Sequence, residues 1–146
     1  MEFFAIADKR TTQEEIQQMC TLEALPLYCA SIESASDVRD EEGVIFCIWG
    51  RFIVRREKIN GGVRFTMPEC PNAFQWTVTT GFPPAPDKIV VHGTVNRTEH
   101  DPDFVESMEE FFAHWKQGLE CHWKAATSRE VNIGKPTPVR LPMFSG

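Results

Sequence analysis

The fold is decided by residues 101–124, which read DPDFVESMEEFFAHWKQGLECHWK. Asp101 can cap a helix, and Pro102 suits the first helical position because proline has no backbone donor to leave unpaired there. Apolar side chains then recur at helical spacing and define one strongly hydrophobic face. They are Phe104, Met108, Phe111, Trp115 and Leu119, with Val105, Phe112 and Trp123 widening the stripe. We therefore predict a long amphipathic helix whose apolar face must be covered.

Upstream of this helix, residues 44–95 carry the pattern of a β-sheet. The run 44–57 predicts one strand, apolar on both faces in its first half and alternating after Gly50, where a bulge or bend is expected. The Asn-Gly-Gly sequence at 60–62 accepts positive φ and predicts a hairpin turn. Alternation of apolar and polar residues predicts three more strands, over 63–67, 74–79 and 88–95.

The first forty residues predict smaller elements. Thr12 and Glu15 have the spacing of a capping box, which indicates a helix that stops at Pro26 because proline lacks a donor and clashes with the preceding turn. Three other segments are predicted here: a first strand or docking segment at 3–7, a strand at 27–32 and an exposed polar loop at 34–42.

These elements predict an α+β fold. Strands joined by short turns should pair as an antiparallel β-meander of about four to six strands, covered by the long C-terminal helix and preceded by a short N-terminal helix. Residues 1–126 are expected to form a single α+β domain, and residues 127–146 an extended or loosely docked tail. The layout is typical of helix-on-curved-sheet folds, including helix-grip and cystatin-like architectures. No motif ties the chain to a named family.

Composition and charge exclude several classes of function. The 146 residues carry a formal net charge of −6, which opposes binding to a phosphate backbone, so we expect no nucleic-acid partner. A short basic strip at 51–58 is read as a solvated strand end. No apolar run approaches the roughly 20 residues that cross a bilayer, so no membrane association is expected.

The cysteines and the first residues bear on the compartment. The start of the chain has no basic region before a short apolar run, so no secretory signal is predicted. The five cysteines are scattered and contain no Cys-x-x-Cys pair, which favours reduced thiols over a disulfide framework or a zinc site. We expect a cytoplasmic protein.

No catalytic, metal or cofactor site is predicted. His114 and His122 lie two helical turns apart, about 12 Å, which is too far for one metal ion. A pairing of Cys70 with His92 has no local signature to support it. No glycine-rich phosphate loop is present, so no nucleotide cofactor is expected. The question of enzymatic activity stays open, and the missing catalytic motif favours a non-enzymatic role.

The number of aromatic side chains supports two hypotheses. The first is a protein-binding or adaptor module that could form homodimers, with Phe112 and Trp123 at the edge of the helical stripe as interface candidates. The alternative is a small apolar-ligand binder, or an enzyme, with a pocket between the C-terminal helix and the sheet. The residues expected to line that pocket are Trp76, His92, Phe111 and Trp115.

Overall fold

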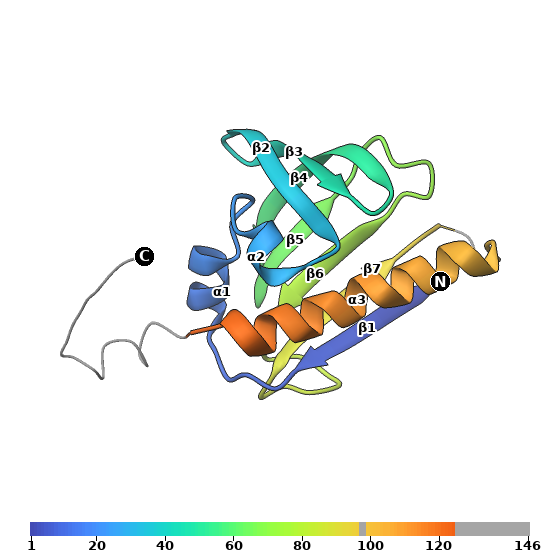
Figure 1. Ribbon diagram of the computed structural model, residues 1–146. Coiled ribbons are helices and arrows are strands. Elements are labelled where there is room, and N and C mark those ends of the chain that lie inside the picture. Colours follow the sequence, from blue (N-terminus) through green and yellow to red (C-terminus); the bar gives the residue numbers. More distant parts are fainter. Residues whose placement is uncertain (97–98, 125–146) are drawn as a thin grey trace.

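The computed structural model, which describes residues 1–96 and 99–124, has a seven-stranded antiparallel sheet curved around one long helix (Figure 1). The predicted α+β class is confirmed. The strands are β1 Glu2–Ala7, β2 Ile32–Arg39, β3 Glu42–Cys47, β4 Gly50–Ile59, β5 Gly62–Thr66, β6 Gln75–Thr79 and β7 Ile89–Thr94; the helices are α1 Gln13–Met19, α2 Leu25–Tyr28 and α3 Pro102–His122.

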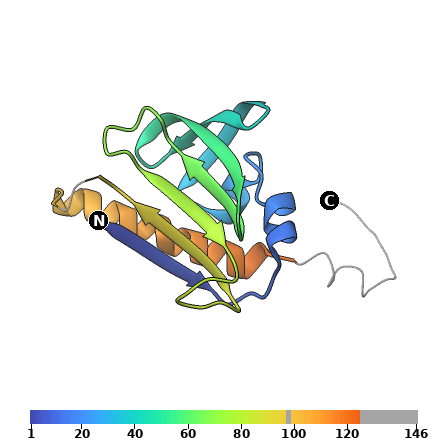
Figure 2. The ribbon, with the colours of Figure 1, turned by 180° about the vertical axis from the view of Figure 1, so that it is seen from behind.

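The sheet is a meander completed by the first strand. Strands β2 to β7 each pair with their neighbour in sequence, and β1 pairs with β7, so that the order is β1-β7-β6-β5-β4-β3-β2. The two edges of the sheet are therefore β1 and β2. Helix α3 lies across the concave face and runs beside β1 in the same direction, as the views from the front and from behind show (Figures 1 and 2).

Both predicted helix starts are confirmed. The Asp101 carboxylate accepts the Asp103 N–H at 2.8 Å, and Pro102 is the first residue of α3. At α1, the Thr12 hydroxyl accepts the Glu15 N–H at 3.2 Å. These bonds satisfy backbone donors that have no partner inside the helix.

Four local predictions were wrong. The helix that starts after Thr12 ends at Met19 and not at Pro26. The run 44–57 is two strands, because the chain turns back at Ile48 and Trp49 and leaves through Gly50, whose φ of +117° is in the region that favours glycine. Where a strand is expected at 27–32, the chain instead has the end of the short helix α2, a turn and the first residue of β2; Pro26 lies at the start of α2, where proline is tolerated. The loop expected at 34–42 is largely the edge strand β2, whose polar residues face solvent.

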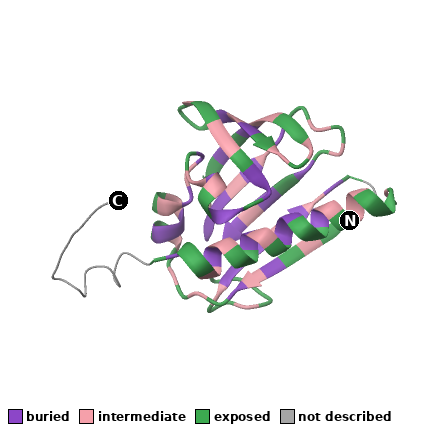
Figure 3. Ribbon diagram, in the orientation of Figure 1, coloured by how far each residue is buried: buried purple, intermediate pink, exposed green. Residues whose placement is uncertain are grey.

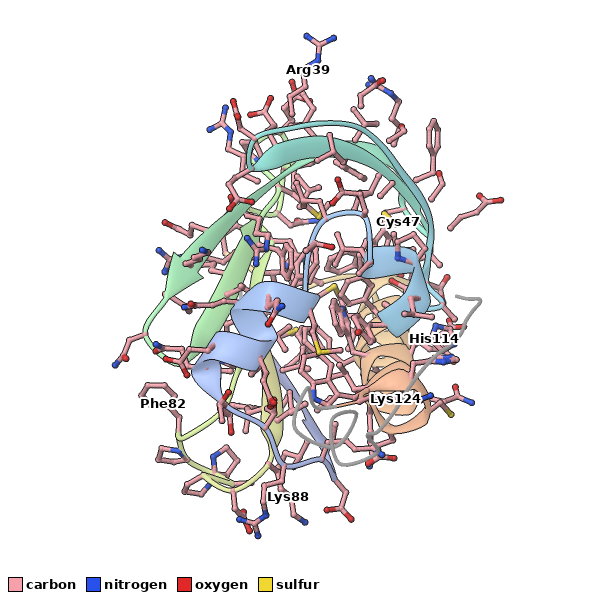
Figure 4. All side chains as sticks on the ribbon, turned by 90° about the vertical axis from the view of Figure 1, so that its left-hand side faces the viewer. Arg39, Cys47, Phe82, Lys88, His114 and Lys124 are labelled. Atoms are coloured by element: carbon pink, nitrogen blue, oxygen red, sulfur yellow. The ribbon has the colours of Figure 1, made fainter. Side chains whose placement is uncertain are left out.

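The core lies between the concave face of the sheet and α3. Its largest fully buried side chains include Phe65 and Trp76 from the sheet and Met108, Phe111 and Trp115 from the helix. Buried positions follow the inner faces of both layers (Figure 3). Seen along the helix, side chains fill the space between the layers (Figure 4). The tail predicted at 127–146 lies outside the described residues.

Candidate functional site

A pocket of about 190 Å³ opens between the N-terminal half of α3, the β3–β4 turn and the connection from β5 to β6. We call it the aromatic pocket. It forms where the sheet curves away from the helix, so that rings from both layers line a space they do not fill. Its lining residues are Trp49, Phe52, Met67, Cys70, Pro71, Asn72, Phe74, Phe104 and Met108.

One wall of the pocket is fixed by Trp49. Its indole Nε1 donates a hydrogen bond to Ser107 Oγ at 2.8 Å, and the Ser107 hydroxyl donates to the Phe104 carbonyl at 2.6 Å. The Trp49 ring centre lies 5.6 Å from that of Phe74 and 5.1 Å from that of Phe111, within the range of favourable aromatic pairs. The half-buried tryptophan thus joins the β3–β4 turn to α3.

The connection at 67–74 forms another wall. Its backbone folds back on itself, because the Cys70 N–H donates to the Met67 carbonyl at 3.0 Å and the Met67 N–H donates to the Phe74 carbonyl at 3.3 Å. The Asn72 carbonyl also accepts the Asn96 N–H at 3.0 Å, beyond the end of β7. Cys70 and Asn72 are half-buried, so they lie where the pocket meets solvent.

The chemistry of the pocket is apolar with two weakly polar groups. Among the lining residues that the structure describes, none carries a formal charge, and the polar side chains are the Cys70 thiol and the Asn72 amide. Such a surface favours an uncharged, compact molecule, since a bound ion would lose its hydration without a countercharge.

The structure brings together three of the residues predicted for a pocket. Trp76 lies 5.2 Å from Phe111 and 6.5 Å from Trp115, measured between ring centres. All three are fully buried, and Trp76 is stacked on the lining residue Phe74 at 5.0 Å. None of the three lines the pocket; they pack together in the core next to its lining residue Phe74.

His92 lies apart from these three residues. Its Nε2 is 2.8 Å from Glu2 Oε1, and its ring stacks on Phe4 at 4.5 Å, on the convex side of the sheet. Strand β7 alternates its side chains between the two faces, so His92 and the neighbouring buried Val91 point in opposite directions.

The two interface candidates are buried within the chain. Phe112 is 2% exposed and stacks on Phe3 at 5.8 Å. Trp123 is 4% exposed and packs on Tyr28 at 5.4 Å. The apolar face of α3 is wide because three elements cover it. The sheet covers its centre, β1 covers Phe112 and α2 covers Trp123.

The buried cysteines Cys20 and Cys29 are unreactive. Burial raises the pKa of the Cys20 and Cys29 thiols to about 12, so both are neutral at physiological pH and pack as small apolar side chains. Within residues 1–96 and 99–124, no group of three or more His, Cys, Asp or Glu side chains could hold a metal ion. No described helix is long and apolar enough to cross a membrane.

Solved structures of low sequence identity share this α+β fold, in which a long C-terminal helix packs on an antiparallel sheet. A START superfamily protein from Mycobacterium smegmatis superposes with a TM-score of 0.54 and 15% identity, over 83% of this chain and 94% of that one. An uncharacterised protein from Bacillus thuringiensis gives a TM-score of 0.59 and 14% identity, over 83% and 97%.

A third similar structure is the protein XoxI from Bacillus cereus, with a TM-score of 0.53 and 14% identity over 80% of this chain and 93% of that one. No protein-family model matches the chain. No curated protein matches it in sequence either. At these low identities the likeness shows the fold.

Proposed function

We propose that the protein binds a small, uncharged, apolar molecule in the aromatic pocket. The observation that carries this proposal is the pocket itself, a space of about 190 Å³ lined by Trp49, Phe74, Phe104 and other apolar residues. An engineered apolar cavity of about 150 Å³ in another protein holds benzene. A space of this size therefore suits a benzene-sized ring with one or two small substituents.

The polar groups at the opening refine the ligand class. Cys70 and Asn72 lie at the solvent side of the pocket, and the aromatic and methionine side chains lie further in. A ligand would place its ring inward and one hydroxyl or carbonyl group toward the Asn72 amide. The START-like fold of the Mycobacterium smegmatis protein supports this arrangement, because a helix held against a curved sheet leaves room for a ligand between them.

The residues that line the pocket fit a role in ligand binding better than a role in catalysis. The only titratable side chain among the lining residues that the structure describes is Cys70, and general acid–base work needs a second group within hydrogen-bond reach. We include a cytoplasmic location in the proposal, because all five cysteines are free thiols, the form that a reducing compartment maintains.

The experiment is a titration with 4-methylphenol followed by isothermal calorimetry. Cys70→Trp should abolish binding by filling the opening, whereas Cys70→Ser, which keeps the space, should bind within about twofold of the wild type. Cys121→Trp places the same ring at an exposed position of α3, away from the pocket, and should bind normally.

A second readout uses the thiols directly. Saturating 4-methylphenol should slow alkylation of Cys70 by iodoacetamide and leave alkylation of the exposed Cys121 unchanged, as measured by mass spectrometry of peptides. Binding that survives Cys70→Trp would place the ligand elsewhere. Failure of 4-methylphenol, toluene and 1-hexanol to bind would contradict the proposed function.

A further inference from the structure

The edge strand β1 offers backbone groups to a partner strand. Met1 and Val95 exchange two hydrogen bonds, Met1 N to Val95 O at 3.2 Å and Val95 N to Met1 O at 3.0 Å. In an antiparallel pair such reciprocal bonding recurs at every second residue. Phe3, Ala5 and Ala7 therefore bond to β7, and the N–H and C=O groups of the residues between them point away from the sheet. These residues are Glu2, Phe4 and Ile6.

The side chains of β1 do not protect this edge. Natural edge strands commonly carry lysine, proline or a bulge that discourages pairing with another chain. β1 reads EFFAIA, pairs with β7 in continuous register and has none of these devices. Phe4, at the middle of the outward set, is 52% exposed on the convex face. An apolar, regular edge of this kind is suited to receive another strand.

A groove runs beside the same edge. It lies between β1 and α3 and is lined by residues 2–6 of the strand and by Glu109, Phe112, Ala113 and Lys116 of the helix. Glu109 and Lys116 are seven residues apart, so they share one helix face and lie about 10.5 Å apart along the axis. The stretch from Glu2 to Ile6 spans about 14 Å, a similar length.

The helix side of the groove carries one acidic and one basic side chain, Glu109 and Lys116, which can pair with each other between two copies of the chain. β1 and α3 run in the same direction, since the Asp8 N–H near the end of β1 donates to Glu120 Oε2 near the end of α3 at 2.9 Å. A two-fold axis through Phe4 passes near Ala113, the small residue between Glu109 and Lys116. Rotation about that axis brings Glu109 of one copy to Lys116 of the other, twice per pair. The Lys116 ammonium already bonds Glu120 Oε2 of its own chain at 2.5 Å and has two further N–H donors for Glu109.

We propose that two copies of this chain associate through antiparallel pairing of β1 with β1. In this register Phe4 lies opposite Phe4 of the second copy, and Glu2 lies opposite Ile6. The outward N–H and C=O groups then bond across the two-fold axis, and the sheet continues from one copy into the other. The two helices lie side by side and antiparallel, with their Glu109–Lys116 pairs at either end of the contact.

A charge-reversal series tests the register. Glu109→Lys alone sets two pairs of lysines against each other, and Lys116→Glu alone sets two pairs of glutamates against each other. Each variant should raise the dimer dissociation constant about tenfold in sedimentation equilibrium. An equimolar mixture of the two variants should form heterodimers of wild-type affinity, because both cross-contacts then join opposite charges.

A backbone variant tests the strand pairing. Phe4→Pro removes an N–H group that faces away from β7, so the fold should persist while the dimer is lost. Phe4→Val keeps the donor and should retain the dimer within about tenfold of the wild-type affinity. Circular dichroism and the thermal midpoint of each variant establish that the chain is folded.

Three results would overturn the proposal. One is a wild-type chain that sediments as a monomer at its highest soluble concentration. The edge of β1 would then be free to pair only with a strand of a different protein. Another is a dimer that the charge-reversed variants form unchanged. The third is a dimer that survives Phe4→Pro. Ligand binding in the aromatic pocket is measured independently, by calorimetry with 4-methylphenol. The dimer proposal and the ligand-binding proposal can therefore fail independently of each other.

Discussion

Trp49 and Ser107 are hydrogen-bonded at 2.8 Å across the gap between the β3–β4 turn and α3, although they are 58 residues apart in sequence. The bond is made by the indole N–H of the half-buried tryptophan and fixes the ring that walls the aromatic pocket. Its removal should therefore affect both the stability of this corner and the pocket.

Ser107→Ala should lower the free energy of unfolding by about 1 kcal/mol, the usual net worth of one such bond. It should also raise the dissociation constant for 4-methylphenol, since the Trp49 ring is no longer held in place. The other three tryptophans are buried, so increased acrylamide quenching of fluorescence would report on Trp49. Ser36→Ala, at an exposed serine of β2, is the control. Unchanged quenching would show that packing alone holds the ring.

Arg56 is the buried charge that should matter most for stability. Its side chain is 5% exposed; Nη1 meets the Glu41 carboxylate at 2.9 Å, Nε donates to the Cys20 carbonyl at 2.7 Å, and Nη2 donates to the Gln17 carbonyl. The guanidinium thus joins β4 to the end of α1 and to the turn before β3.

Arg56→Lys should cost about 2 kcal/mol, because one ammonium group cannot reach the acceptors that the forked guanidinium serves. Glu41→Gln should cost less than about 1 kcal/mol, because that side chain is 51% exposed and water replaces its carboxylate. Urea denaturation of both variants gives the comparison. Equal losses would mean that the ion pair, rather than the two carbonyl contacts, is the main contribution.

Gly118 lies inside α3, although glycine is a poor helix former. Its presence is explained by the close packing of α3 against α2 at this position. A Cβ atom at this position would lie 2.1 Å from the Tyr28 carbonyl oxygen. Gly118→Ala should therefore lower stability by about 2 kcal/mol, even though alanine gains about 1 kcal/mol in helix propensity. Gln117→Ala, at the exposed neighbouring position, should change it little. A higher thermal midpoint for Gly118→Ala would contradict the close approach of the two helices.

Glu120 should give stability that depends on pH. A hydrogen bond from Lys116, and a further one from the Asp8 N–H, lower the pKa of this carboxyl below its ordinary value of 4.5. The charged form is favoured in the folded state, so its contribution is complete above the ordinary pKa and disappears as the pH falls through the folded pKa.

The difference in free energy of unfolding between the wild type and Glu120→Gln should therefore be largest near neutral pH and shrink on acidification. Glu106→Gln, an exposed substitution elsewhere on α3, is the control and should show no such trend. Urea denaturation at a series of pH values measures it. A difference that grows toward acidic pH would have the wrong sign and would contradict the assigned contacts.

Sequence patterns predicted α3 and the hairpin at Gly61 well, because capping, periodicity and turn chemistry all act locally. The patterns gave wrong predictions where the structure of a segment depends on which strand it pairs with and not on its own sequence. The run 44–57 is uniformly suited to strands, and only the positive φ of Gly50 marks the reversal. The polar sequence of β2 predicts a loop, because an edge strand with one solvated face needs few apolar residues.

The candidate site could be predicted only in part. Periodicity identified Trp76, Phe111 and Trp115 as inward-facing, and the fold packs them together in the core, although none of them lines the pocket. The lining residues Trp49 and Cys70 belong to turns, where no period indicates which way a side chain points. His92 is also a predicted pocket residue, but the alternation in β7 that buries Val91 places His92 on the opposite face.

The pairing of β1 with β7 has a consequence for how the chain is made. Met1 bonds to Val95, 94 residues later, and Asp8 bonds to Glu120, 112 residues later. The segment of β1 therefore has no native partner until β7 and α3 have been synthesised, about 5 to 20 seconds later at ordinary rates of elongation. During that interval the apolar sequence EFFAIA is exposed. β1 can therefore join the sheet only after the strand and the helix that hold it have been made.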